Sequence, residues 1–292
     1  MSASEFNYDM NYERRGIALV INIRYFDPNP DIEKQLEERV WSEKDVENLR
    51  KTFEYLEFDF KLLENLKAEE IKANMQALGK YINHSNSDCF LCVVMSHGSQ
   101  EKIMGSDNKE ISFEDIMAPI KSCTSLMNKP KIFLFQACRG EYEMESPINH
   151  QTKQNQTKIS TMIDGSIKED YLNMTDSLPF DGKVRTKIET ESDLLVYYST
   201  LKNYVSFAFN DAREGTYFIK SVCDVFNEAY KNLPQNMSLS RMILNINKRV
   251  RDEGKALADP RSTLTKEIYF KPKKVSILKR EREKFSIYFI AK

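Results

Sequence analysis

A cysteine and a histidine each follow an apolar run in this chain. Lys131 to Gln136 leads through Ala137 into Cys138, and Cys89 to Met95 leads through Ser96 into His97. If both runs are neighbouring strands of a parallel sheet, the two side chains lie at the same carboxyl edge. A thiol attacks only as the thiolate, and an imidazole can take its proton and later protonate a leaving amine. The pair therefore indicates nucleophilic hydrolysis, with Cys138 as the nucleophile and His97 as the general acid/base.

Glycines flank both residues. Gly98 and Gly140 let the backbone approach a substrate closely, and the amides of Gly98 and Cys138 are candidates for an oxyanion hole. The alternative is an inert core thiol beside an ordinary strand-end histidine, which holds for most such pairs. The run Gln-Ala-Cys-Arg-Gly at 136–140, with Ser-His-Gly about forty residues upstream, favours the catalytic interpretation.

Composition limits the class of protein. The chain has 292 residues, 41% of them apolar, which is enough for a full core in one large domain or two small ones. A net charge of −1 argues against nucleic acid or a membrane surface as the main partner. Five cysteines, an odd number in so long a chain, indicate a reducing compartment. Without an apolar leader in residues 1–15 or a run long enough to span a membrane, we expect a cytoplasmic protein.

Cys89 and Cys92 form a Cys-x-x-Cys pair, but inside a strand they point to opposite faces. No second pair of cysteines or histidines lies at ligand spacing, so we predict core thiols, no metal and no cofactor.

Strands and helices alternate along most of the chain, which predicts an α/β fold with a mostly parallel sheet and helices on both faces. Ser42 and Asp45 have the spacing of a capping box at the start of a helix. The expected strands are 16–23, 58–63, 89–95, 132–135, 193–198 and 264–270, and the expected helices are 42–57, 67–82, 113–120, 216–232 and 238–253.

Two segments do not follow this alternation. Residues 141–191 are polar and aperiodic, which is typical of a mobile or functional segment. The tail from Lys271 carries eight Lys and Arg against two Glu, and is either a last strand at 285–290 or a disordered basic extension.

The chain resembles the caspase family of aspartate-specific cysteine peptidases, in particular the executioner type with a short prodomain. The resemblance runs from Asn7 to Phe270, and its motifs are Asn-Tyr-Asp-Met at 7–10, Leu-Arg-Lys-Thr-Phe at 49–53, Met-Ser-His-Gly at 95–98, Gln-Ala-Cys-Arg-Gly-Glu at 136–141, Tyr-Tyr-Ser-Thr at 197–200 and Thr-Lys-Glu-Ile-Tyr-Phe at 265–270. It implies a three-layer sandwich around a six-stranded, mostly parallel sheet. The implied organisation is a prodomain at 1–15, a large subunit at 16–145, a linker at 146–190, a small subunit at 191–270 and a basic extension at 271–292.

The resemblance also implies a role for each site residue. Cys138 and His97 perform the chemistry, and Arg39 and Gln136 hold the substrate Asp at P1; a buried carboxylate needs such a cation and hydrogen bonds. A solvated loop arginine is the alternative for Arg39. The small-subunit residues that match the substrate loop are Ser206, Phe207 and Ala208, and the candidate processing sites are Asp164, Asp176 and Asp181.

The implied partners are protein substrates with Asp at P1 and an upstream initiator caspase that cuts the linker. Two large–small subunit pairs would form a homodimer, or a heterodimer with another caspase, with two six-stranded sheets side by side. Such enzymes are zymogens that act in apoptosis.

Three departures from the family pattern bear on function. The family has an arginine where this chain has Ala208, or Asn210 by the other count, and Arg213 is the one arginine of that loop. Trp41 stands where the family has glycine. The basic tail has no counterpart in the family that we recognise.

Two function hypotheses follow. The first is an active executioner-type peptidase, favoured by the intact Cys138, His97 and Gln136. The second is a pseudo-caspase that regulates a partner caspase by dimerisation, favoured by Ala208. Specificity for a basic P1 residue is disfavoured because Arg39 would repel it.

Overall fold

A six-stranded sheet forms the centre of the computed structural model, which describes residues 5–31, 35–142, 191–206, 208, 212–231, 237–253 and 256–273. The strand order is β10-β8-β6-β3-β1-β2; β10 runs antiparallel to β8 and the other neighbours are parallel. This confirms the predicted architecture. The strands are β1 (Ile17–Asn22), β2 (Asp59–Glu64), β3 (Phe90–Met95), β6 (Lys131–Gln136), β8 (Leu194–Tyr198) and β10 (Asp259–Ser262).

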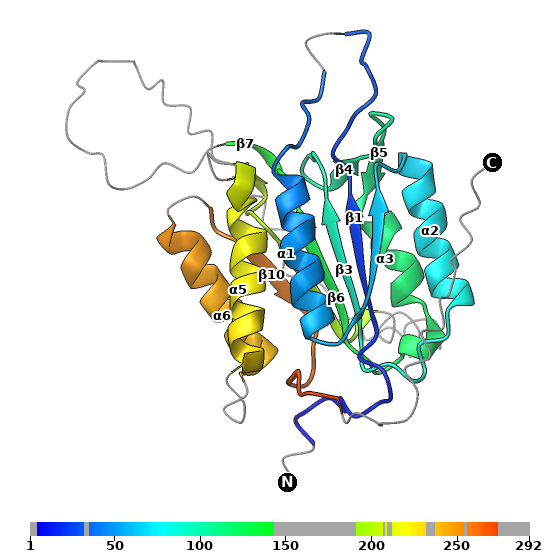
Figure 1. The fold of residues 1–292 in the computed structure, drawn as a ribbon. Helices are drawn as coiled ribbons and strands as arrows, with labels where there is room; N and C mark the ends of the chain where they lie inside the picture. Colours follow the sequence, from blue (N-terminus) through cyan, green and yellow to red (C-terminus); the bar gives the residue numbers. More distant parts are fainter. Residues whose placement is uncertain are drawn as a thin grey trace, which may run out of the picture.

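Helices cover both faces of the sheet (Figure 1). Helices α1 (Ser42–Tyr55), α5 (Tyr217–Lys231) and α6 (Leu239–Asp252) pack on one face, and α2 (Ala68–Tyr81) and α3 (Phe113–Lys121) on the other. Side chains of β3 alternate between the two cores, and all six residues of the strand are buried. That is why its sequence is continuously apolar. Within the described part of the chain, no helix is long and apolar enough to cross a membrane.

The predicted strand at 264–270 is wrong. The edge strand β10 precedes it, and the chain then leaves the sheet, so that Ile268 and Phe270 are buried in the core beneath α1 and α5. The alternating apolar residues at 264–270 belong to a buried connection and not to a strand. The sequence of β10 does not resemble a strand because it contains a proline and two charged residues. Short elements that the sequence did not predict are β4 (Lys102–Met104), β5 (Glu110–Ser112), β7 (Gly140–Tyr142), β9 (Asn203–Tyr204) and the 3-10 turns η2 (Thr124–Leu126) and η3 (Ala212–Glu214).

The predicted capping box of α1 is also wrong. Helix α1 begins directly after Trp41, and the first-turn side chains do not cap it. The buried carboxylate of Asp45 instead accepts a hydrogen bond from the backbone N–H of Thr216, at 2.8 Å. Asp45 thus binds a residue that is distant in the sequence and does not make the local capping contact that the spacing predicted.

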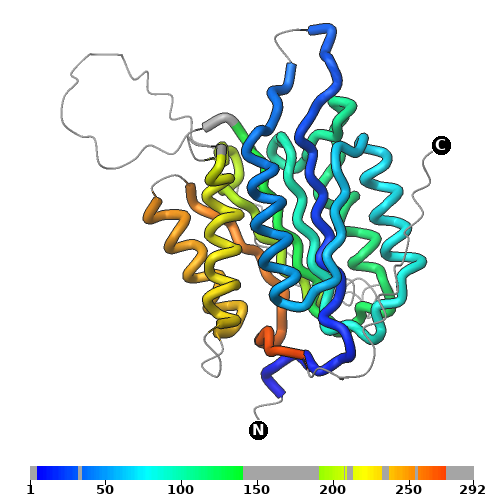
Figure 2. The backbone as a smooth tube through the Cα atoms, in the orientation of Figure 1, coloured from blue at the N-terminus to red at the C-terminus, as the bar shows by residue number. Residues whose placement is uncertain are grey.

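The segment after the last strand is tied to the start of the chain. Asp88 and Arg15 form an ion pair of 2.8 Å, and both side chains are fully buried. The ammonium of Lys273 also contacts Asp88 and donates to the backbone carbonyls of Met10 (3.1 Å) and Tyr12 (2.8 Å). In Figure 2 these terminal segments meet at the end of the sheet opposite the loop that follows β1. Charge pairing thus connects the two ends of the described chain.

We expect Asp88→Asn to lower the free energy of unfolding by about 3 kcal/mol, because it leaves Arg15 buried without its counter-ion. Lys273→Met should cost less, because Lys273 is partly exposed and Arg15 still neutralises Asp88. Urea unfolding of both variants checks this order. Equal losses would contradict the assignment of Arg15 as the main partner of Asp88.

Candidate active site

The pairing of β3 with β6 places the two predicted catalytic residues at one edge of the sheet. Met95 lies opposite Gln136 in the parallel register. His97 and Cys138 each follow two residues later, and the backbone N–H of Ser96 still donates to the carbonyl of Gln136, at 3.3 Å. Adjacent strands are about 4.8 Å apart, so the structure brings the two residues to neighbouring positions.

Cys138 differs in exposure from the other cysteines. All five are free thiols; Cys138 is partly exposed, whereas Cys89, Cys92, Cys123 and Cys223 are buried. Burial raises the pKa of Cys89 and of Cys223 to about 12 and raises that of Cys92 as well. Attack on a substrate is therefore open to Cys138 and closed to these buried thiols.

The imidazole of His97 is held in one tautomer. Its Nε2 lies 2.8 Å from the backbone carbonyl of Glu37, and a carbonyl can only accept, so Nε2 carries the proton. Burial lowers the pKa of His97, and the nearby charge of Arg39 lowers it further, against the opposing effect of the Glu37 carbonyl. The neutral ring thus keeps a free lone pair on Nδ1, as a general base requires.

Gly98 is packed against the backbone of the cysteine loop. A Cβ atom at this position would lie 3.0 Å from the carbonyl oxygen of Cys138 and 3.0 Å from Cβ of Ala137. The close contact explains the need for glycine and sets the two backbone segments side by side. Their N–H groups are the ones that the sequence assigns to an oxyanion hole.

Arg39 is buried, with 7% of its surface exposed, so it is not a solvated loop arginine. Its Nη1 donates to the side chain of Asn22 (3.3 Å) and the carbonyl of Ile23 (2.9 Å). Burial lowers its pKa to about 10, opposed by the charges of Asp45 and Cys138. Among the described residues no carboxylate lies within ion-pair distance of Arg39. A buried guanidinium of this kind favours an incoming anion.

Ser206 occupies the space between the thiol and Gln136. Its backbone N–H lies 3.4 Å from Sγ of Cys138, and its carbonyl lies 3.9 Å from the same sulfur. Its hydroxyl accepts a hydrogen bond of 2.9 Å from Nε2 of Gln136, whose Oε1 is buried without a partner in the described structure. The described side chains show no hydrogen bond between the thiol and His97. A ligand that takes the Nε2 donor of Gln136 would have to displace the hydroxyl of Ser206.

The remaining predicted site residues lie in different surroundings. Ala208 is half-buried and forms an antiparallel bridge to Thr216. Arg213 is exposed on η3. Phe207 and the candidate processing sites Asp164, Asp176 and Asp181 lie outside the described residues.

Comparison with known proteins identifies the family. Residues 15–269 match the family model of the caspase domain. The chain belongs to the caspase family. It is 30% identical to caspase-8 of Mus musculus over 91% of this chain and 53% of that protein, and 30% identical to caspase-7 of Gallus gallus over 91% and 80%. It is 28% identical to caspase-3 of Bos taurus over 91% and 88%. The chain thus spans about half the length of caspase-8 and most of the shorter relatives.

Asp45 is a site residue that sequence reasoning missed. It is fully buried beside Arg39, and its Oδ1 accepts the Thr216 N–H at the end of the loop that carries Ser206. A Cβ atom on Gly215, whose φ is +83°, would lie 2.4 Å from that oxygen. Burial raises the pKa of Asp45 to about 7, against the opposing hydrogen bonds of Thr216 and the charge of Arg39. Asp45 therefore lies between Arg39 and the loop that carries Ser206.

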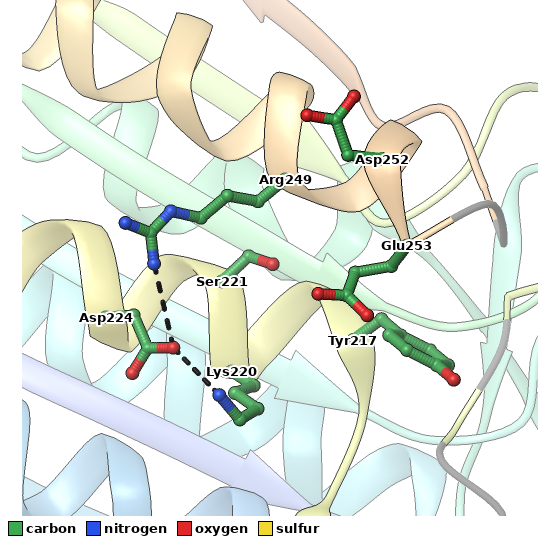
Figure 3. A pocket seen from close by; sticks show the side chains of 7 residues that line it. All are labelled: Tyr217, Lys220, Ser221, Asp224, Arg249, Asp252 and Glu253. Atoms are coloured by element: carbon green, nitrogen blue, oxygen red, sulfur yellow. Dashed lines mark hydrogen bonds and ion pairs between the residues drawn. The ribbon is translucent and has the colours of Figure 1, made fainter.

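A hollow of about 350 Å³ lies between α5 and α6 (Figure 3) and shares no residue with the site just described. The carboxylate of Asp224 lies between Lys220 (2.9 Å) and Arg249 (3.8 Å), and Arg249 also pairs with Glu228 outside the hollow, at 2.6 Å. We assign it no role in catalysis. It is lined by Tyr217, Lys220, Ser221, Asp224, Arg249, Asp252 and Glu253.

We expect iodoacetamide to label Cys138 alone in the folded protein at neutral pH, because the other four thiols are buried. Mass spectrometry of the digested protein should find one labelled peptide, and Cys138→Ala should take up no label until it is denatured. Labelling of Cys89 or Cys223 at a similar rate in the folded protein would refute this.

Asp45 should give the stability a defined pH dependence. Its pKa is about 4 in an unfolded chain and about 7 in the folded one, so between these values the folded state holds a proton that the unfolded state lacks. The contribution of Asp45 to the free energy of unfolding is therefore highest below pH about 4. It decreases by up to about 4 kcal/mol as the pH rises to about 7. Asp45→Asn lacks this slope, so relative to wild type it should gain stability across that range. Parallel curves in denaturant titrations would contradict the assignment.

Proposed function

We propose that this caspase-family chain is a cysteine endopeptidase that cleaves proteins after Asp. The observation that carries the proposal is the buried Arg39, without an ion-pair partner among the described residues, beside Cys138 and His97. The fixed Nε2 proton of His97 supports the assignment of Nδ1 as the base. The family is one of cysteine peptidases; activity and Asp specificity are proposals for this chain.

The chemistry follows from these groups. Nδ1 of His97 takes the proton of Cys138, and the thiolate attacks the main-chain carbonyl carbon of the P1 Asp. The backbone N–H groups of Gly98 and Cys138 stabilise the oxyanion. The imidazolium then protonates the leaving amine, and the C–N bond breaks to give a thioester. Water, deprotonated by His97, hydrolyses the thioester and restores the thiol.

Arg39 and Gln136 would hold the P1 carboxylate. The guanidinium offers donors in a fork that matches a carboxylate. Nε2 of Gln136 now donates to Ser206, and displacement of Ser206 by the substrate would release this donor. Entry of the substrate thus exchanges one set of hydrogen bonds for another.

We extend the proposal to activation and setting. The chain is a cytoplasmic zymogen that acts in apoptosis, with a prodomain at 1–15 and a basic extension at 271–292. An upstream initiator caspase cuts the linker at 146–190, after Asp164, Asp176 or Asp181, and separates the large subunit (16–145) from the small one (191–270). The working unit is a homodimer or a heterodimer with another caspase.

A second function rests on two specific observations. Ala208 stands where the family has an arginine, and Ser206 lies against the thiol. In this second function, the chain is a catalytically impaired pseudo-caspase that regulates a partner caspase through dimerisation.

Hydrolysis assays separate the two functions. We expect the protein precut in the linker to cleave peptides ending in Asp faster than precut Cys138→Ala does. Equal rates for the two proteins would rule out the peptidase and leave the regulatory function.

Ala208→Arg should restore a second cation to the P1 pocket. A charged partner of a buried carboxylate is worth several kcal/mol, so kcat/KM for Asp peptides should rise about 100-fold or more. Ala208→Lys serves as the control, because it adds charge without the planar fork. If Ala208→Arg leaves the rate unchanged, Trp41→Gly in the same background tests whether the indole blocks the pocket.

A further inference from the structure

The imidazole of His97 has a second neighbour besides the Glu37 carbonyl. The ring of Phe26 lies with its centroid 5.0 Å from the centroid of the imidazole, at an interplanar angle of 44°. This separation is within the range of direct contact between aromatic rings. Phe26 and Glu37 both belong to the segment between β1 and α1. Two residues of one segment therefore contact the same imidazole.

The hydrogen bond to Glu37 leaves the imidazole some rotational freedom. The χ2 torsion of histidine, about the Cβ–Cγ bond, has a broad energy well. Nε2 lies close to the axis of this rotation and Nδ1 lies farther from it, so a small rotation moves Nδ1 more than it moves Nε2. The hydrogen bond therefore fixes the tautomer better than it fixes the direction of Nδ1. A ring packed beside the imidazole opposes the rotation itself.

The backbone is anchored on both sides of Phe26. On one side, the N–H of Tyr25 donates to the side-chain oxygen of Asn65, at 3.0 Å. On the other side, the N–H of Asp27 donates to the carbonyl of Ser106, at 2.7 Å. The side chain of Phe26 also packs against the core on the α2 and α3 face of the sheet. These contacts hold the ring without help from the imidazole, as a group that positions another side chain requires.

Phe26 also limits the access of water to the imidazole. Burial is the largest cause of the lowered pKa of His97, and a ring in contact supplies part of that burial. The charged groups near the imidazole are Arg39, which lowers the pKa further, and Glu37, which raises it. The thiol of Cys138 lies at the neighbouring position. Removal of the Phe26 ring alters none of these groups, so its effect on the pKa comes from hydration.

We propose that Phe26 is a positioning residue for His97, whose ring keeps Nδ1 in one direction while the Glu37 carbonyl holds Nε2. Phe26 acts through the imidazole and needs no contact with a substrate. The orientation of the imidazole does not depend on peptidase activity. The effect of Phe26 on the rate rests on the function proposed above, in which Nδ1 takes the proton of Cys138.

Nuclear magnetic resonance of the full chain with isotope-labelled histidine tests the orientation. The chain has three histidines, and His97→Gln identifies the signals of interest. The Nε2–H proton of His97 in the wild type should give a resolved signal that exchanges slowly with water. In Phe26→Ala we expect this proton to exchange about 10-fold faster, and the pKa of His97 to rise toward its ordinary value of about 6.5. Phe26→Tyr retains the ring and should keep the wild-type exchange rate and pKa.

Phe60→Ala is the matched control. Phe60 is also partly buried, but it lies on β2 and packs against the core on the opposite face of the sheet. Its removal should leave the exchange rate and the pKa of His97 unchanged. The proposal is overturned if Phe26→Ala keeps the wild-type values, or if Phe60→Ala changes them equally. If Phe26→Ala does not fold, Phe26→Leu, which keeps apolar volume without a ring, is judged by the same exchange rate.

Hydrolysis by the precut protein tests the effect on the rate. Phe26→Ala should lower kcat for Asp peptides about 3- to 10-fold and leave KM nearly unchanged, because Arg39 and Gln136 are retained. The loss of activity at acid pH should begin at a higher pH, because a raised pKa keeps His97 protonated over a wider range. An unchanged kcat and pH profile in a protein that cleaves would refute the catalytic part of the proposal. A wild type that does not cleave refutes the proposed function alone, and the exchange data still decide the orientation.

Discussion

The parallel register of β3 and β6 is the constraint on which the site depends. Side chains alternate along a strand, so a shift of one residue would turn His97 or Cys138 to the other face. The register is itself fixed by burial, because every residue of both strands is covered by helices on one face or the other. Core packing on both sides of the sheet therefore sets the positions of two polar residues beyond its edge.

Arg139 extends this constraint to the outer strand. It follows Cys138 directly and is fully buried. Its guanidinium lies over the ring of Tyr198 at 3.9 Å and donates to Asp259 in β10 at 2.8 Å. A buried cation needs such partners. Asp259 thus joins the cysteine loop to the edge strand, and the same carboxylate holds Arg261.

The sequence predicts most of this arrangement because most of it is local. A continuously apolar run predicts a strand buried on both faces, and residues just after two such strands lie at one edge. This reasoning finds Cys138 and His97. It does not find Asp45, because a serine three residues earlier offered a local role and the real partner, Thr216, lies 171 residues away. The sequence pattern also assigns 264–270 to a strand, because only the local alternation of apolar residues is visible in it. Alternation shows that Ile268 and Phe270 are buried, and burial is compatible with a chain that has left the sheet.

The electrostatics of Arg39 follow from its burial with Asp45. With a pKa of about 7, the carboxylate of Asp45 is about half protonated near neutral pH and neutralises only part of the guanidinium charge. Burial is the main cause of the lowered pKa of Arg39, and the charge of Asp45 opposes it only in part. A substrate carboxylate would supply the missing negative charge. Its binding would be favourable because Arg39 lacks a full counter-ion in the free protein. The family places a second arginine at the position of Ala208. Here one guanidinium and the amide of Gln136 must replace water around the whole carboxylate. Whether the chain cleaves substrates or regulates a partner therefore depends on the strength of this single cation, and not on the thiol and imidazole.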